Sequence, residues 1–239
     1  MNTYLSHSLK LKYSCILVCL LATTGCFNTE NTSKPKQEIS SQKANEEKLN
    51  LLEDFPAMSE DGDVNAVIEI PTGTIEKWEV SKSTGQLELE EIDGAPRLVN
   101  YLGYPGNYGM IPRTLLPKEM GGDGDPLDIL VLGPPEEKGS VVICKVIGVL
   151  KLIDRGEQDD KLVAVSTQSA FYKVNDLEEL ASNYGGVTNI IETWFTNYKG
   201  SGKMISNGFG DKQSALNILN VAIEQYEFSE TRKEGSEIN

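Results

Sequence analysis

No stretch of this chain restricts its backbone more than the hexapeptide Asp-Gly-Asp-Pro-Leu-Asp at residues 123–128, which leads into an apolar run. In an extended chain Asp123 and Asp125 share one face and Asp128 lies on the other. Gly124 and Pro126 must therefore bend the chain if the three carboxylates are to meet. Carboxylates on a forced turn beside a buried strand are typical oxygen ligands of hard cations. The alternative is an acidic surface turn.

The N-terminal quarter of the chain does not resemble a folded domain. Lys10 and Lys12 precede a nine-residue apolar core at residues 14–22. This core is too short to span a bilayer, and the pattern indicates a bacterial signal peptide over residues 1–25. Small residues precede Cys26, so we expect acylation of this cysteine and an exported lipoprotein held at a membrane of the cell envelope, periplasmic or outer. An ordinary signal peptide and an uncleaved anchor are the alternatives.

Composition divides the remaining chain into three parts. Residues 26–62 are poor in apolar side chains and rich in Asn, Ser, Gln, Glu and Lys, which predicts a disordered tether. Its end carries Leu49, Leu51, Leu52 and Phe55, which could form a short docking segment. Residues 63–230 form one domain of ordinary size, long enough to bury a core, and residues 231–239 form a tail.

Charge and cysteine content narrow the classes of function. The formal net charge is −14, and loss of Lys10 and Lys12 with the signal makes it −16 (−14 − 2). Binding of nucleic acid through its phosphates is excluded by this charge. A small anion could bind only where cations and local Lys or Arg reverse the sign of the field. Cys144 is the one cysteine of the domain, so we expect a buried thiol without a disulfide.

Hydrophobic periodicity predicts a strand-rich body followed by helices. We expect a short helix that Asn175 or Asp176 caps, an amphipathic helix over residues 187–198, and a last helix after Asp211. Strands first and helices after favour an α+β fold, and many short strands favour a small closed barrel. The predicted strands are residues 64–70, 74–80, 86–92, 129–132, 141–152 and 162–165.

Several further polar residues have two interpretations each. Asp154 and Asp159 flank one loop, which is either a ligand-bearing loop or a solvated hairpin loop. Glu69 lies in an apolar strand whose alternation does not force it inward. The tyrosines of residues 101–109 alternate with turn formers, so we expect them on a loop, where they bind phosphate oxygens or only pack. Lys199 follows a helix, where the helix dipole alone would explain it.

Taken in order, these motifs resemble the soluble family I inorganic pyrophosphatases over residues 64–203. The resemblance implies a five-stranded OB-like barrel with flanking helices. It also implies Mg²⁺-dependent hydrolysis of pyrophosphate to two phosphates by a metal-activated water. Several Mg²⁺ ions are implied, with Mn²⁺ or another divalent ion as an alternative, together with a homo-oligomer. The motifs are Glu69-Ile70-Pro71, Lys77-Trp78-Glu79, Arg97, residues 104–109, residues 123–128, residues 154–161 and Tyr198-Lys199.

The resemblance also implies a role for each matching residue. Asp125 would be the general base, with Tyr108 beside the nucleophile and Glu79 and Tyr104 in support. The metal ligands would be Glu69, Asp123, Asp128, Asp154 and Asp159. The phosphoryl oxygens would be held by Lys77, Arg97, Lys161, Tyr198 and Lys199.

The chemistry of the available side chains agrees with direct attack by water. The only histidine, His7, lies in the signal, so the domain has no Cys/His pair for covalent catalysis. Divalent ions would neutralise the phosphoanhydride and acidify the water, and phosphoryl transfer depends mainly on positioning and charge. The competing hypothesis is an envelope lipoprotein that binds metal or phosphate without turnover.

Overall fold

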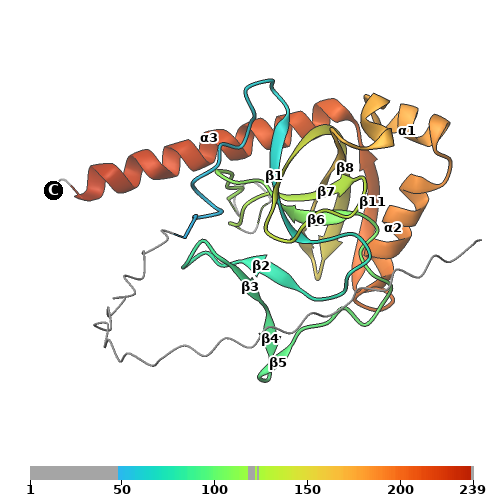
Figure 1. The fold of residues 1–239 in the computed structure, drawn as a ribbon, viewed down its shortest axis with the longest axis horizontal. Helices are drawn as coiled ribbons and strands as arrows, with labels where there is room; N and C mark the ends of the chain where they lie inside the picture. Colours follow the sequence, from blue (N-terminus) through green and yellow to red (C-terminus); the bar gives the residue numbers. More distant parts are fainter. Residues whose placement is uncertain (1–47, 118–121, 123, 238–239) are drawn as a thin grey trace, which may run out of the picture. The chain divides into compact units, whose positions relative to one another are not determined.

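The computed structural model describes residues 48–117, 122 and 124–237 (Figure 1). The predicted signal peptide, Cys26, the first part of the predicted tether and Asp123 lie outside the described residues. Within the described ranges, no helix is both long enough and apolar enough to span a bilayer.

Most strands join one mixed sheet. Its hydrogen-bonded order is β1-β6-β7-β10-β8-β11, and β8 also pairs with β1, so five strand pairings lead from β1 back to β1. The pairing of β7 with β10 is parallel, and the other four pairings of this ring are antiparallel. The strands of this sheet are β1 (Val64–Ile70), β6 (Asn107–Met110), β7 (Asp128–Leu132), β8 (Val141–Asp154), β9 (Glu157–Gln158), β10 (Lys161–Ser166) and β11 (Met204–Gly210).

Strands β1 and β10 are buried along their whole length, as expected for strands covered on both faces. The register of β8 against β10 shifts at Gly148. A Cβ on Gly148 would lie 2.3 Å from the Leu177 side chain, so the approach of the following helix requires glycine here.

Two small hairpins extend from this sheet (Figure 1). The first joins β2 (Trp78–Val80) to β3 (Leu87–Leu89), and the second joins β4 (Glu91–Ile92) to β5 (Ala95–Pro96). Asp93 and Gly94 have φ values of 54° and 76°, as a two-residue type I′ turn requires. The predicted strand at residues 86–92 is therefore divided between two hairpins, because this turn reverses the chain again.

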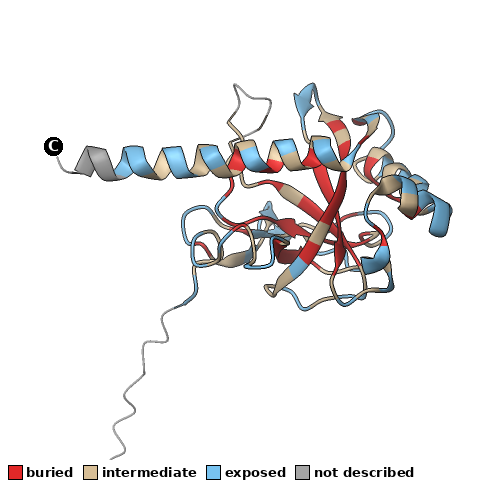
Figure 2. Ribbon diagram, turned by 90° about the horizontal axis from the view of Figure 1, so that it is seen from above, coloured by how far each residue is buried: buried red, intermediate tan, exposed pale blue. Residues whose placement is uncertain are grey.

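Helices cover one side and one edge of the sheet. They are η2 (a 3-10 helix, Ala170–Lys173), α1 (Leu177–Asn183), α2 (Val187–Asn197) and α3 (Lys212–Glu237). Asp176 caps α1 by accepting a hydrogen bond from the Glu179 N–H (2.8 Å), which confirms the predicted cap. Helix α2 packs on β11, and α3 packs on β8 and β11. Figure 2 shows that, among the residues of α3 whose burial is described, the buried ones lie in the first half of the helix.

Two predictions about strands were wrong. Tyr108 was expected on a loop with Tyr104, but it lies in β6, whose four residues are all buried. Gly109 made this segment look like a turn. Its missing side chain instead lets β1 approach, since a Cβ there would lie 1.8 Å from the Val67 carbonyl oxygen. Strands also do not all precede the helices, because β11 lies between α2 and α3.

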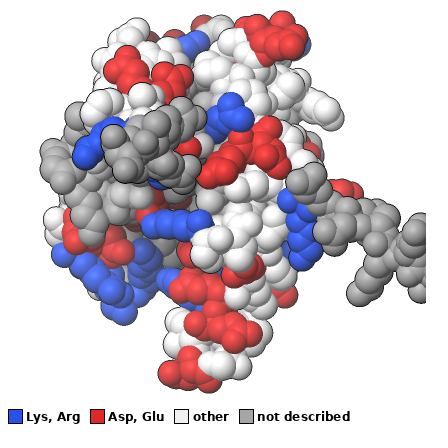
Figure 3. All heavy atoms as spheres, turned by 90° about the vertical axis from the view of Figure 1, so that its left-hand side faces the viewer, with Lys and Arg blue, Asp and Glu red and all other residues white. Residues whose placement is uncertain are grey.

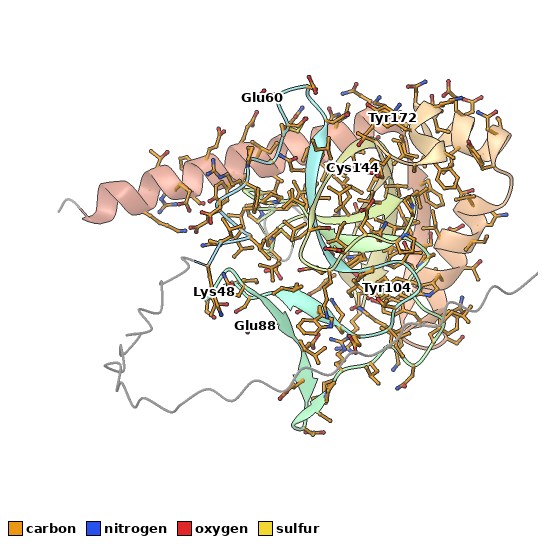
Figure 4. All side chains as sticks on the ribbon, in the orientation of Figure 1. Lys48, Glu60, Glu88, Tyr104, Cys144 and Tyr172 are labelled. Atoms are coloured by element: carbon orange, nitrogen blue, oxygen red, sulfur yellow. The ribbon has the colours of Figure 1, made fainter. Side chains whose placement is uncertain are left out.

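The folded part begins earlier and ends later than residues 63–230. Leu51 and Leu52, predicted to belong to the tether, pack against Val67, Val80 and Met110. Helix α3 continues to Glu237. Two larger apolar clusters lie on the two faces of the sheet, and Cys144 on β8 is fully buried in one of them, as predicted (Figure 4).

Candidate active site

One cavity of about 230 Å³ collects nearly all the predicted site residues that the structure describes. Asp154 lines an adjoining cavity that shares Arg97, Tyr198 and Lys199 with the first. Asp123 lies outside the described residues. The predicted residues that line the first cavity are Glu69, Lys77, Glu79, Arg97, Tyr104, Tyr108, Asp125, Asp128, Asp159, Lys161, Tyr198 and Lys199.

Lys161 stands at the centre of the acidic side of the cavity. It begins β10 and is 2% exposed. Its Nζ donates to Asp128 at the start of β7 and to Asp159 Oδ1 (2.6 Å). Burial would lower the pKa of Lys161, but the two carboxylates outweigh burial and raise it. Parallel pairing of β7 with β10 places the two strand starts side by side, which explains how residues 33 positions apart meet.

Glu69 points into the cavity rather than into solvent. It lies in β1, is 6% exposed, and its Oε1 accepts a hydrogen bond from the Val80 N–H (2.7 Å). Burial raises the pKa of Glu69 to about 7, although Lys77 and the Val80 N–H lower it. Glu69 is therefore not a solvent-facing strand residue, because the strand is covered on both faces.

Asp154 and Lys199 form a second charged pair across the end of β8. Lys199 Nζ donates to Asp154 Oδ2 (2.7 Å), while Asp154 Oδ1 is buried and has no hydrogen-bond partner among the described residues. Burial would lower the pKa of Lys199, but Tyr198 and Asp154 outweigh it. Burial of a carboxylate oxygen without a partner is energetically unfavourable, so a cation or a hydrogen-bond donor beside Oδ1 of Asp154 would stabilise it.

Aromatic rings form the opposite wall of the cavity. The Trp194 ring stacks on Tyr198 (centroids 4.5 Å apart, 13° between planes) and contacts Tyr104 (4.4 Å). Tyr108 is buried, its pKa is raised by burial, and Lys77 Nζ lies 5.5 Å from its ring centroid. Burial also raises the pKa of Tyr104, so the Tyr104 and Tyr108 hydroxyls are neutral donors at neutral pH.

Three residues beside the site were not predicted. Glu90 receives two hydrogen bonds from Arg97 Nη1 (2.6 and 2.7 Å) and orients it. Lys82 and Leu52 line the cavity, and Lys82 Nζ donates to Asp125 Oδ1. The sequence holds only a weak signal for them, since Lys82 sits among turn residues and Leu52 lies in a polar segment.

Acids and bases balance among the described residues that line the cavity. These include five carboxylates (Glu69, Glu79, Asp125, Asp128, Asp159) and five cations (Lys77, Lys82, Arg97, Lys161, Lys199). Figure 3 shows the same mixture on one face of the molecule, where acidic and basic side chains lie next to one another. Among the described residues, no three Asp, Glu, His or Cys side chains gather closely enough to hold an ion by themselves.

Comparison with known proteins identifies the family. The family model for inorganic pyrophosphatases matches residues 66–227, which include every predicted site residue except Cys26. The chain belongs to the inorganic pyrophosphatase family. An inorganic pyrophosphatase of Campylobacter jejuni is 34% identical over 167 residues, which cover 68% of this chain and 91% of the relative.

Solved structures of the family share the fold. The inorganic pyrophosphatase of Thermus thermophilus superimposes with a TM-score of 0.63 at 29% identity, covering 75% of this chain and 99% of its own. The Helicobacter pylori inorganic pyrophosphatase gives a TM-score of 0.62 at 31% identity, covering 73% of this chain and 99% of its own. A mixed sheet with few helices makes this family member α+β, as predicted.

Proposed function

We propose that this chain hydrolyses inorganic pyrophosphate to two phosphates, with a divalent cation, of which Mg²⁺ is typical for the family. The observation that carries this function is a cavity, in a member of the inorganic pyrophosphatase family, whose charged side chains suit the reaction. Five carboxylates and five cations line a space of about 230 Å³, which suits a small, highly charged anion with its counterions.

The residues present fit Mg²⁺. Its ligands would be Asp128, Asp154, Asp159 and Glu69, together with Asp123, which lies outside the described residues. All are hard oxygen donors. The structural observation that supports a cation here is Oδ1 of Asp154, which is buried and has no hydrogen-bond partner among the described residues. When bound, Mg²⁺ would neutralise charge on the phosphoanhydride and make water more acidic.

The cations of the cavity bind and orient the substrate. Lys77, Arg97, Lys161, Lys199 and the Tyr198 hydroxyl hold phosphoryl oxygens, in the way that fixed donors stabilise phosphoryl transfer. Glu90 keeps the guanidinium of Arg97 in one orientation through two hydrogen bonds. Glu79 does the same for Lys77 (2.5 Å).

Asp125 accepts the proton of the attacking water at its carboxylate. Asp125 lines the cavity together with Tyr198 and follows Gly124, whose φ of 86° lets the chain turn there. Tyr108 and Tyr104 support the reacting groups from the aromatic wall, where their buried rings also limit the access of bulk water.

The ring of pairings from β1 through β6, β7, β10 and β8 back to β1 supports the expectation of a five-stranded OB-like barrel. Closure of this ring of strands brings Glu69 on β1 and Lys161 on β10 into the same cavity. Comparison of the strand tilt with that of known OB barrels in an experimental structure would test this description.

Phosphate release from pyrophosphate tests the activity. The purified chain with Mg²⁺ should release phosphate, and Asp125→Asn should lower kcat by at least about 10²-fold, as expected for loss of a general base. Asp128→Asn should lose most of the activity as well. Asp93→Asn is the matched control, because Asp93 is exposed in a hairpin turn outside the cavity. Tight binding of Mg²⁺ and pyrophosphate without any phosphate release would favour the non-catalytic alternative.

Export and lipid attachment rest on the sequence alone. We infer acylation at Cys26 and retention at a membrane of the cell envelope. Cys26→Ser should move the protein to the soluble envelope fraction, and unchanged membrane retention would contradict acylation there. We also infer a homo-oligomer. The exposed apolar side chains of Leu102 (72%) and Ile190 (62%) support it, and the mass measured by light scattering tests it.

A further inference from the structure

A short segment at residues 51–53, which we call the clasp, is hydrogen-bonded to both walls of the cavity. The Leu51 N–H donates to the Gly85 carbonyl (2.8 Å) on one wall. On the other wall, the Arg113 N–H donates to the Leu52 carbonyl (3.0 Å), and Arg113 Nε donates to the Glu53 carbonyl (2.7 Å). The clasp therefore fixes how far apart the two walls stand.

The first wall presents Lys82. The Gly85 N–H donates to the Ser81 carbonyl (2.7 Å), which closes the turn between β2 and β3 on which Lys82 lies. Gly85 has a φ of 64°, and a Cβ there would lie 2.0 Å from Oδ1 of Asn50, the residue before the clasp. Only glycine allows this contact between the turn and the chain that enters the clasp.

The second wall presents Asp125. Arg113 begins a stretch whose Leu116 N–H donates to the Asp125 carbonyl (3.4 Å), and whose Thr114 Oγ1 accepts from the Leu127 N–H (2.9 Å). Arg113 itself has a φ of 51°, a left-handed conformation that is unfavourable for a residue with a Cβ. Such a conformation is kept where several neighbouring contacts hold it in place. Here the hydrogen bonds from Arg113 to the Leu52 and Glu53 carbonyls do so.

Side chains of the clasp complete the connection. Leu51 and Leu52 pack against Val80 and Met110, which belong to β2 and β6. Leu52 also lines the cavity together with Lys82 and Asp125. The ion pair from Lys82 Nζ to Asp125 Oδ1 then crosses from the first wall to the second.

We propose that Lys82 and Leu52 are positioning residues for the hydrolysis: Lys82 holds the Asp125 carboxylate in the cavity, and Leu52 holds the two walls at the separation this pair needs. This inference rests on the proposed function, in which Asp125 accepts a proton. The side chain of Lys82 is 62% exposed, and exposed ion pairs contribute little to stability. Its loss should therefore appear in catalysis rather than in the free energy of unfolding.

Steady-state kinetics on the full chain with Mg²⁺ and pyrophosphate tests this inference. Lys82→Ala should lower kcat by about tenfold or more, up to the roughly 10²-fold that a misplaced reacting group can cost, with little change in KM and in Tm. Leu52→Ala should lower kcat to a similar extent. Lys82→Arg and Leu52→Met should retain most of the activity. The matched control is Leu49→Ala, whose side chain is 60% exposed and lies outside the clasp.

A double-mutant cycle separates positioning from general loosening of the fold. If Leu52 acts through the Lys82–Asp125 pair, Leu52→Ala should change kcat less than about twofold in the Lys82→Ala background. Additive effects of the two substitutions would overturn the inference, and so would a kcat of Lys82→Ala within twofold of the wild type. In either case, phosphate release by the wild-type protein would leave the proposed function intact. If Leu52→Ala fails to fold, Lys82→Ala alone still decides. A wild-type protein that releases no phosphate would instead overturn the proposed function itself.

Discussion

Replacing Lys161 by methionine removes the one buried cation that stands between two carboxylates of the site. The Lys161 side chain is 3% exposed, while those of Asp128 and Asp159 are 28% and 20% exposed. Methionine fills a similar volume, so the change removes the charge and leaves the packing nearly intact. The two carboxylates would then face each other with little water to screen them.

The loss of stability expected for Lys161→Met follows from the burial of this ion pair. Removing one partner of a buried ion pair destabilises proteins by about 3–5 kcal/mol, because the other charge stays buried without compensation. Asp128 and Asp159 retain partial access to water, which favours the lower end of this range. We therefore expect Lys161→Met to lower the free energy of unfolding by about 3 kcal/mol, or to shift the urea midpoint by about 1.5 M at a slope near 2 kcal/mol/M.

Urea unfolding followed by circular dichroism, in EDTA and in excess Mg²⁺, measures this effect. The penalty should be largest in EDTA and smaller in Mg²⁺, because a divalent ion compensates the same carboxylates and stabilises the native state by mass action. Lys173→Met is the matched control, since Lys173 is exposed in η2 and should change stability by less than about 0.5 kcal/mol. A loss below about 1 kcal/mol for Lys161→Met in EDTA would refute the reasoning.

Three further predictions concern the scaffold. Gly109→Ala should prevent folding or cost more than about 3 kcal/mol, because its Cβ would meet the Val67 carbonyl oxygen at 1.8 Å, whereas Gly185→Ala, with open space around it, should melt like the wild type. Leu219→Ala should lower the free energy of unfolding by about 2–5 kcal/mol in denaturant titration, since this fully buried side chain joins α3 to the sheet. Burial raises the pKa of the Cys144 thiol, so peptide mapping should find Cys144 unmodified by iodoacetamide at pH 8 in the native protein and modified in urea.

The local elements of the fold could be predicted because they follow from short-range patterns. Alternation identified β1, and the polar residue before an apolar period identified the start of α1 at Asp176. The missed strand β11 contains Gly208 and Gly210, which weaken the pattern, and its strand character comes from pairing with β8, 50 or more residues earlier. Tyr108 was misplaced for the same reason, since Gly109 serves close packing of β1 and not a turn.

The candidate site could be predicted where chemistry leaves a sequence signal and not where it depends on tertiary contact. Three aspartates on a bent turn stand out in any acidic chain. Glu90, which contacts Arg97, and Lys82, which contacts Asp125, leave no such signal, because in the sequence they are ordinary charged residues. Only the pairing of the hairpins places one beside Arg97 and the other beside Asp125. Buried Glu69 could not be assigned from the sequence because alternation alone leaves its side open.

The charge balance of the cavity makes the binding of a polyanion depend on added cations. The whole chain carries −14, so its average field repels pyrophosphate. Inside the cavity five cations offset five acids, and each of Lys77, Lys161 and Lys199 is held by a carboxylate within 2.7 Å. A site in which every base is already paired gains little attraction for the anion from its own charges. Affinity for pyrophosphate must therefore come with positive charge added beside those carboxylates. Pyrophosphate binding, measured by calorimetry, should consequently be weak in EDTA and strengthen steeply with Mg²⁺, whereas tight binding in EDTA would mean that the lysines alone suffice.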